Sequence, residues 1–373
     1  MEHQTVAKEL DWDFSGSKSA RDHHAIHPYP AKFISEIPKQ LIEMLGIRKN
    51  QSILDPFCGS GTTLAVAQQF GIESYGIDLN PIACLISKVK TSEYNGCSEC
   101  RVEEIIEKAA KMQSPNFPDL NIPNVDHWFK REVQEKIYAL RKVIINSEST
   151  DERDFLLLSL SRILVKVSNQ DSDTRYAAVE KPMANYDVYE QFRSSTAAVT
   201  GMLKKRSYGH VSATVFNGNI LEMDMSKVEQ NVGLIVTSPP YPNAYEYWLY
   251  HKYRMFWLNH DPIRVKEAEI GARAHFFKKN HHTPEDFYNQ MKRTLEQCIQ
   301  VSSDEAKMAF VVGRSKIHGE IIDNANIIES AAKSLGLKHI DTFKRQMRAS
   351  KKSFNLSHAN IKEESIVVLG KNK

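Results

Sequence analysis

The sequence predicts an α/β fold built on a doubly wound, mostly parallel sheet, and three observations predict it. The apolar run 51–55 leads into a glycine-rich turn and then into a helix-like run at 62–70, which is how an α/β nucleotide-binding unit begins. A second apolar run, 73–77, follows after the length of one crossover helix, and this spacing forces parallel pairing. Strand-like and helix-like runs resume after residue 210. Together they favour one sheet with helices on both faces.

The individual elements follow from the alternation of apolar and polar residues along the chain. We expect seven strands, at 51–55, 73–77, 212–216, 233–237, 307–312, 338–344 and 365–369. Helices of the sheet domain are expected at 62–70, 246–258, 285–301 and 324–335.

A long interruption separates the second and third expected strands. Helical periodicity recurs within it, at 103–112, 131–145, 154–167 and 186–203, and its basic and acidic residues are nearly balanced. A structureless loop of this length would be unusual inside a compact domain. We therefore expect a mostly helical insert at 90–209, packed on a sheet domain that comprises 1–89 and 210–373.

Composition narrows the class of protein. The chain has 373 residues, of which 41% are hydrophobic and 25% charged, which excludes disorder and collagen-like repeats. No apolar run approaches the ~18–20 residues that span a bilayer, and residues 1–14 lack the apolar region of a signal peptide. We expect a cytoplasmic protein without a membrane partner. Its five cysteines are too few for a disulfide framework, so reduced thiols are expected.

The charge balance excludes a protein that coats nucleic acid without selectivity, because the net charge is only +3. Any positive surface must therefore be local. One basic cluster contains no acidic residue, and it consists of Lys344, Arg345, Arg348, Lys351 and Lys352. Its two interpretations are contact with phosphates and a simple solvated run of charge.

The first motif is the turn after the first strand, residues 55–61, which reads DPFCGSG. Glycines there let the backbone approach a ligand, and the exposed amides at the helix start attract a carboxylate or phosphate. A phosphate-binding P-loop would need a lysine next, where Thr62 and Thr63 stand, so an NTPase is disfavoured. A dinucleotide site stays open because Asp78 ends the second strand and could hold ribose hydroxyls. A purely structural turn also stays open.

The second motif is residues 237–241, which read TSPPY. Two prolines directly after a buried strand end the ladder and fix an extended turn, which presents the Ser238 hydroxyl, the Pro239 carbonyl and the Tyr241 ring. Sheet stability does not require this arrangement. It suits a site that holds an exocyclic amine by two hydrogen-bond acceptors while a ring stacks on the base.

Together, DPFCGSGTT at 55–63 and TSPPY at 237–241 resemble the S-adenosylmethionine-dependent amino-methyltransferases of DNA, in the branch that modifies the N4 amine of cytosine. Three further segments resemble that family: HPYPAKF at 27–33 its N-terminal cofactor segment, GIDLNP at 76–81 its ribose-binding motif, and FNGNI at 216–220 its third-strand motif. In the last, Asn219 stands where Asp is common, and its amide oxygen can still accept a hydrogen bond.

The resemblance implies a Rossmann-like, seven-stranded methyltransferase sheet with S-adenosylmethionine as cofactor and double-stranded DNA as partner, together with a possible cognate restriction endonuclease. The implied cofactor-binding residues are Phe33, Asp55, Pro56, Phe57, Gly59, Gly61, Asp78 and Asn219. The implied catalytic residues are Ser238, Pro239, Pro240 and Tyr241. The basic cluster falls where the family has a hairpin near the target base, and the insert is the candidate for reading the DNA sequence.

The expected reaction methylates a cytosine flipped out of the duplex. The N4 lone pair is delocalised into the ring, and hydrogen bonds to Ser238 and Pro239 would free it for attack. A strong general base is unnecessary because the proton leaves during or after transfer. No metal is expected, since Cys97 and Cys100 supply only half the spacing of a zinc site.

Three alternatives remain open. Adenine-N6 methylation of DNA can use the same geometry. Some tRNA guanine-N2 methyltransferases carry a similar glycine motif, but they usually show Asp and Gly where this chain has Ser238 and Pro242. A non-enzymatic nucleic-acid-binding module would have lost the cofactor motif or the amine motif, and both are intact.

Overall fold

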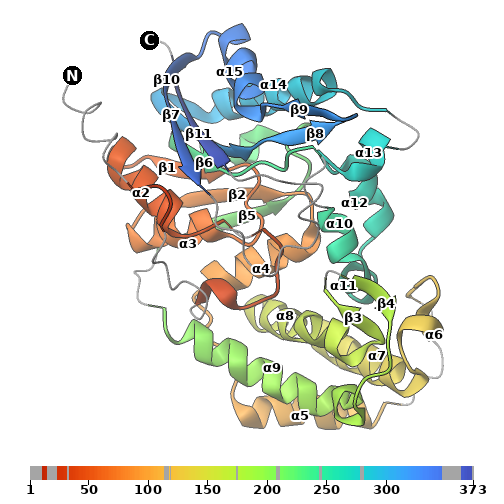
Figure 1. The fold of residues 1–373 in the computed structure, drawn as a ribbon. Helices are drawn as coiled ribbons and strands as arrows, with labels where there is room; N and C mark the ends of the chain where they lie inside the picture. The colour runs from red at the N-terminus through yellow and green to blue at the C-terminus, as the bar shows by residue number, and fades with distance from the viewer. Residues whose placement is uncertain are drawn as a thin grey trace.

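The protein is described by a computed structural model that covers residues 11–14, 23–31, 33–112, 117, 119–173, 175–206, 211–242, 246–277, 281–346 and 363–371. Its centre is a seven-stranded sheet in the order β10-β11-β7-β6-β1-β2-β5 (Figure 1). The strands are β1 (Ser52–Asp55), β2 (Ser74–Asp78), β5 (Ala213–Asn217), β6 (Val232–Thr237), β7 (Ser302–Gly313), β10 (Lys338–Gln346) and β11 (Glu363–Gly370).

All pairings in this sheet are parallel except those of β11, which runs antiparallel to both β7 and β10. The Rossmann-like, mostly parallel seven-stranded sheet predicted from the sequence is confirmed. β1 and β6 are buried at every position, as expected of central strands covered on both faces. The chain passes from β1 to β2 on one side and later places β6 on the other, so a topological switch point lies at the carboxyl end of β1.

Helices cover both faces of the sheet (Figure 1). On one face, α2 (Glu36–Leu45) and α3 (Thr62–Gln69) pack on alternate residues of the strands, such as Ile53 and Leu234. On the other face, α14 (Pro284–Val301) and α15 (Asn324–Ser334) pack on the residues between them, such as Leu54 and Ile235. This alternation is the period of two expected of strands.

The insert is mostly helical, with α5 (Glu99–Ala110), α6 (Val125–Trp128), α7 (Arg131–Ile145), α8 (Thr150–Val167) and α9 (Val188–Leu203). The bounds expected for α7 are correct, and the other three expected helices are displaced by a few residues at their starts or ends. A β-hairpin, β3 (Gln170–Ser172) with β4 (Arg175–Ala178), was not expected. Its strands are short and polar, so no apolar alternation marked them.

The insert and the sheet domain share one apolar core. That core contains residues of α4 (Pro81–Thr91), which flanks the sheet, together with residues of α5, α7, α8 and α9 and of α11 (Lys252–Trp257), which follows the TSPPY motif. The chain enters and leaves the insert side by side, because the Arg206 guanidinium donates to the carbonyls of Lys90, Ser92 and Tyr94. The insert therefore packs on the sheet domain through this shared core.

The prediction of a single helix at 246–258 is wrong. Two short helices occur instead, α10 (Tyr247–Tyr250) and α11, and they meet at the buried His251. Apolar and aromatic residues occur on every side of this segment, so its periodicity could not reveal the break. Beyond it lie α12 (Pro262–Ala268), α13 (Arg273–Phe277) and the hairpin of β8 (Ser315–Ile317) and β9 (Glu320–Ile322), none of which was expected.

The remaining described elements are three short 3-10 helices, η2 (His23–Ala25), η3 (Met183–Tyr186) and η4 (Met225–Lys227). In the part of the chain that the structure describes, no helix has the length and apolar character needed to cross a membrane. All five cysteines are free thiols.

Candidate functional site

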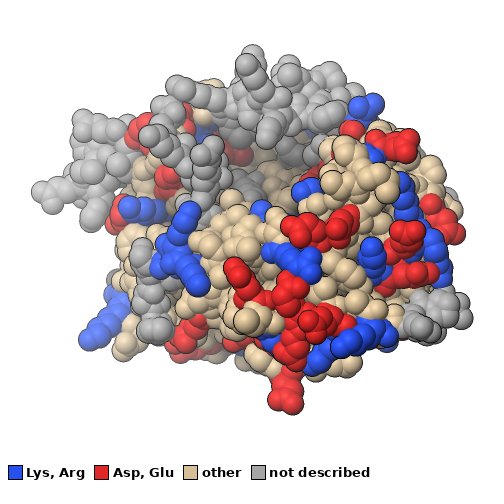
Figure 2. All heavy atoms as spheres, turned by 90° about the horizontal axis from the view of Figure 1, so that it is seen from below, with Lys and Arg blue, Asp and Glu red and all other residues tan. Residues whose placement is uncertain are grey.

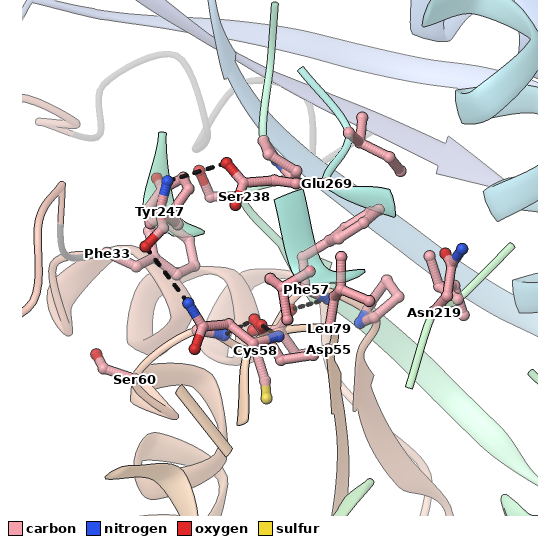
Figure 3. Close-up of a pocket in the computed structure, with 18 of the residues that line it drawn as sticks. Phe33, Asp55, Phe57, Cys58, Ser60, Leu79, Asn219, Ser238, Tyr247 and Glu269 are labelled. Atoms are coloured by element: carbon pink, nitrogen blue, oxygen red, sulfur yellow. Dashed lines mark hydrogen bonds between the residues drawn. The ribbon is translucent and has the colours of Figure 1, made fainter. Parts of the chain in front are cut away.

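An open cleft lies at the carboxyl ends of β1, β2 and β6, at the switch point of the sheet. Its walls come from the loops that follow these strands and β5, from residues 29–33 before α2, and from α10 and α12 (Figure 3). It contains about 890 Å³ of empty space including its open mouth. In an α/β sheet of this kind, ligands bind at the switch point, where this cleft lies.

Most of the predicted cofactor residues line this cleft. They are Phe33, Asp55, Pro56, Phe57, Gly59, Asp78 and Asn219. Gly59 has φ +49°, its N–H donates to Asp78 Oδ2 at 2.8 Å, and a Cβ there would lie 3.1 Å from the Tyr29 hydroxyl. The glycine thus brings the backbone against both the second strand and the N-terminal segment.

Gly61 is not among the lining residues. It precedes α3 with φ +73°, and a Cβ there would lie 2.7 Å from Ser87 Oγ on α4. The close approach of α3 to α4 therefore accounts for this glycine, and the cofactor contact predicted for it has no support in the geometry.

Two carboxyls line the cleft, those of the buried Asp55 and the half-buried Asp78. Asp55 Oδ1 accepts the Thr237 hydroxyl at 2.6 Å and the Phe57 N–H at 3.1 Å. Asp78 accepts the N–H groups of Gly59 and Asn80. Burial raises the pKa of each to about 6 against these hydrogen bonds, which lower it. The Asp55 bond also ties the end of β1 to the end of β6.

The TSPPY motif contributes two lining residues, Ser238 and Pro240. Pro239 is buried and does not line the cleft. Tyr241 packs against the core beneath α14 and forms a hydrogen bond with Glu364 of β11. Its ring is outside the cleft, so the geometry does not support the stacking role predicted for it. The aromatic side chains among the described lining residues are those of Tyr29, Phe33, Phe57 and Tyr247. Tyr29 and Tyr247 stack on each other, with 5.7 Å between their ring centres.

Sequence reasoning missed Glu269, which directly follows α12 and lines the cleft near Ser238 (Figure 3). Its side chain is buried, and its two carboxylate oxygens accept the N–H groups of Tyr247 at 2.9 Å and Trp248 at 2.7 Å. Burial raises the pKa of Glu269 to about 8, although both hydrogen bonds lower it. No motif marked this residue, because short helices without clear periodicity separate it from Ser238.

The charges around the cleft are of one sign. Asp55, Asp78 and Glu269 all line it, and no Lys, Arg or His is among its described lining residues. Each carboxyl has a raised pKa because burial penalises its charged form. A ligand that carries positive charge would relieve this penalty, so the cleft favours a cationic ligand.

The basic cluster is only partly described. Lys344 is exposed and pairs with Glu363 at 3.1 Å, whereas Arg345 is buried and pairs with Glu364 at 3.3 Å. The guanidinium of Arg345 is thus directed at β11 and not at solvent. Arg348, Lys351 and Lys352 lie outside the described residues.

The face of the insert at the bottom of Figure 1 carries basic and acidic side chains mixed together (Figure 2). Several of them pair with one another, among them Arg101 with Glu152 at 3.0 Å and Arg193 with Glu103 at 2.5 Å. This face therefore does not form a positive patch. Over the described ranges, no group of three or more His, Cys, Asp and Glu side chains is arranged to hold a metal ion.

Residues 2–89, which include the glycine turn and Asp78, match the model of a family described as DNA methylase. The Type II methyltransferase M.MvaI of Kocuria varians is 23% identical over 87% of this chain and 84% of its own length. M.BsoBI of Geobacillus stearothermophilus is 25% identical over 68% of this chain and 56% of its own length. These matches support the DNA amino-methyltransferase family.

Further similarities are shorter or more distant. M.MjaII of Methanocaldococcus jannaschii is 40% identical over 92 residues, which are 23% of this chain and 17% of that protein. Among solved structures, a TehB-like SAM-dependent methyltransferase from Corynebacterium glutamicum is 11% identical, with 90% of this chain and 87% of that chain covered and a TM-score of 0.33. The fold assignment for this chain rests on its own sheet order.

Proposed function

We propose that this protein is a site-specific DNA methyltransferase that uses S-adenosylmethionine to methylate the N4 amine of a flipped cytosine. One observation supports this most strongly. A single cleft contains Ser238 and Pro240 from the end of β6 together with Gly59 and Asp78 from the ends of β1 and β2. Cofactor motif and amine motif, distant in sequence, line the same cleft, which direct methyl transfer between their ligands requires.

The charge of the cleft suits this cofactor. When bound, S-adenosylmethionine supplies an electrophilic methyl group on a positively charged sulfur. Asp78 is available for ribose hydroxyls, Asn219 for the adenine amine, and Phe33 with Asp55 for the methionine portion. Three carboxyls, with no basic side chain among the described lining residues, favour a cation, which an anionic nucleotide would not provide.

The target amine is held by the Ser238 hydroxyl, which lines the cleft, and by the carbonyl of Pro239, a residue that is itself buried but is bonded to the lining Pro240. Pro240 follows directly, and its fixed φ keeps the turn extended. Two hydrogen bonds from the amine would pyramidalise its nitrogen and direct the lone pair into the cleft. Tyr247 lines the cleft and replaces Tyr241 as the ring that stacks on the flipped base.

DNA contacts are assigned to two regions. Lys344 and the basic residues Arg348, Lys351 and Lys352 contact phosphates, and the insert 90–209 reads the sequence. The shared core of α8 and α11 supports the second assignment, because it connects the insert rigidly to the segment that follows the catalytic motif. A cognate restriction endonuclease is the proposed biological partner.

Transfer of labelled methyl groups tests this proposal. Purified protein is incubated with methyl-labelled cofactor and either enzymatically amplified, unmethylated DNA of mixed sequence or unmodified tRNA. We expect label in the duplex DNA and none in the tRNA. Labelled tRNA with unlabelled DNA would refute the substrate, and label in neither, with no cofactor binding, would refute the enzymatic function.

A further inference from the structure

Glu269 is a buried acid in the cleft for which the motifs give no role. It lies on the same side of the cleft as Ser238, whereas Asp55 and Cys58 lie on the other side (Figure 3). Its position after α12 places a carboxylate on the amine side of a site that otherwise offers only a hydroxyl and a carbonyl there. The TSPPY loop itself contains no Asp, Glu or His.

We propose that Glu269 accepts the proton released from the target amine, and that the positive charge of the bound cofactor ionises Glu269 beforehand. This proposal rests on the methyltransferase function proposed above. It adds a catalytic residue. It also states that the positive charge of the ligand converts this residue to its ionised form.

The first argument is the orientation of the carboxylate. The N–H groups of Tyr247 and Trp248 each donate to one of its oxygens, which fixes the plane of the carboxylate at the cleft wall. A carboxylate oxygen has two lone-pair positions, so each can accept a further hydrogen. The side chain is only 7% exposed, so bulk water does not compete freely for those positions.

The second argument is the charge that faces Glu269. Glu246 before α10 and Asp78 at the end of β2 both disfavour its ionised form. Tyr29 and Tyr247 also line the cleft, and burial raises the pKa of Tyr29 well above its ordinary value. On the preceding helix α12, Lys266 has its ammonium over the Trp248 ring, 5.2 Å from the ring centre, and is not a lining residue. Burial then raises the pKa of Glu269 to about 8, so near neutral pH the empty cleft keeps it largely protonated.

A cation bound in the cleft reverses the preference of Glu269 for its protonated form. It favours the carboxylate form of every acid around it, so Glu269 loses its proton when the sulfonium ligand binds. The demethylated product has a neutral sulfur and otherwise the same charges, so it lacks this effect. Glu269 is therefore expected to be a base with the substrate form bound and an acid with the product form bound.

The proton transfer then balances. The amine nitrogen uses its lone pair to bond the methyl carbon, and the electrons of the broken carbon–sulfur bond stay on sulfur. The nitrogen, now positive, loses one N–H proton to a Glu269 oxygen, and the electrons of that bond return to nitrogen. The proton leaves to solvent when the site opens, and no oxidant or further reactant is needed.

Calorimetric titration in buffers of different ionisation enthalpy tests the charge coupling without turnover. Near pH 8, where about half of Glu269 is protonated, S-adenosylmethionine should release up to about half a proton more than S-adenosylhomocysteine. Glu269→Gln should abolish most of that difference. Glu267→Gln, which removes an exposed carboxylate two residues away, should retain it. An equal difference in wild type and Glu269→Gln would overturn the coupling.

Kinetics test the proton acceptor. Glu269→Gln should lower the rate of methyl transfer by roughly 100-fold, in the range of lost general-base catalysis, and should remove the acidic limb of the pH–rate profile. Glu269→Asp should restore part of the rate and the limb. A folded Glu269→Gln protein, checked by thermal unfolding, that keeps the wild-type profile would overturn the proposal. Failure of the methyltransferase function itself is distinguishable, because wild-type protein would then bind neither ligand.

Discussion

Thr237 joins the two halves of the site at the scale of single residues. Its hydroxyl donates to Asp55, which ends β1, and the next residue is Ser238. A residue of the cofactor motif and a residue of the amine motif are thus held in register by one buried hydrogen bond of 2.6 Å. The distance between the methyl donor and the amine then depends on strand ends and not on a mobile loop.

The first prediction concerns Ser238. Replacing it with Ala removes one of two acceptors for the amine and leaves the cofactor side of the cleft intact. We expect loss of most turnover, roughly 100-fold or more, with cofactor affinity within a few-fold of wild type. Equilibrium binding and single-turnover rates measure the two effects. Ser334→Ala, on α15 away from the cleft, should change neither. A fully active Ser238→Ala protein would refute the role of the hydroxyl.

A second prediction uses the buried Asp55. Its folded pKa, about 6, is above the ordinary value of 3.8, so between these pH values the folded state binds more protons than the unfolded state. Stability from this group is therefore present below about pH 4 and lost as the pH rises through about 6. Asp55→Asn should abolish this pH-dependent loss in the free energy of unfolding, which amounts to as much as about 3 kcal/mol. The same substitution should weaken binding of a cationic ligand.

Denaturant unfolding of wild type and Asp55→Asn at about pH 4 and about pH 7.5 measures this effect. The variant should gain stability relative to wild type at the higher pH. Its Asn Oδ1 can still accept from Thr237 and Phe57, so the hydrogen bonds that hold β1 to β6 persist. If the free energy of unfolding depended on pH equally in both proteins, burial would not be raising the pKa of Asp55.

At the scale of elements, the strand β11 contacts the TSPPY loop. Glu364 lies opposite Arg345 in the β10–β11 register, pairs with it, and also forms a hydrogen bond with Tyr241. Both charged side chains are almost fully buried, with 10% and 12% of their side-chain surface exposed. Arg345 therefore belongs to a structural ion pair that supports the TSPPY loop from below.

This ion pair gives a third prediction. Arg345→Met leaves Glu364 buried without its ionic partner, and we expect a loss of about 3–5 kcal/mol in the free energy of unfolding. The double variant Arg345→Met, Glu364→Leu should lose much less, because both charges are gone. Lys344→Met breaks an exposed pair at the adjacent position and should cost at most about 1 kcal/mol. Equal losses in all three variants would contradict the burial argument.

The element scale also shows what the sequence could predict. All seven strands of the sheet were expected, because buried strands between glycine and proline turns have a distinct apolar pattern. The pocket residues that follow directly on those strands, such as Asp55, Asp78 and Ser238, were found for the same reason. Glu269 was not, because it enters the cleft after a short helix whose path depends on tertiary packing. Gly61 and Tyr241 were assigned to the ligand from their place in the two turns and from the resemblance, whereas Gly61 lies against Ser87 of α4 and Tyr241 packs on the core.

At the scale of the whole molecule, the insert and the sheet domain are connected at both chain crossings. Arg206 forms hydrogen bonds with three carbonyls at the start of the insert and with the Asn95 side chain. A guanidinium can satisfy several acceptors at once, which a lysine cannot do with the same geometry. These bonds hold the end of the insert against its start, next to the sheet domain, which suits the sequence-reading role proposed for the insert.

A fourth prediction follows for Arg206. Arg206→Ala removes the guanidinium donor from these three carbonyls and should loosen the crossing at residues 90–95. We expect faster cleavage there by a nonspecific protease under native conditions, with the sheet domain still folded. Lys205→Ala, at the adjacent exposed position, should leave the cleavage rate unchanged. Unchanged proteolysis of Arg206→Ala would show that the shared core alone holds the insert.

Mass spectrometry of nucleosides tests the central claim most directly. Amplified duplex DNA is incubated with S-adenosylmethionine and either wild-type protein or Ser238→Ala, then digested completely. The wild-type reaction should contain N4-methylcytosine, and the variant reaction should contain little or none. Methyl groups found only on adenine N6 would contradict the assigned base, and a methylated product that forms equally with Ser238→Ala would contradict the site.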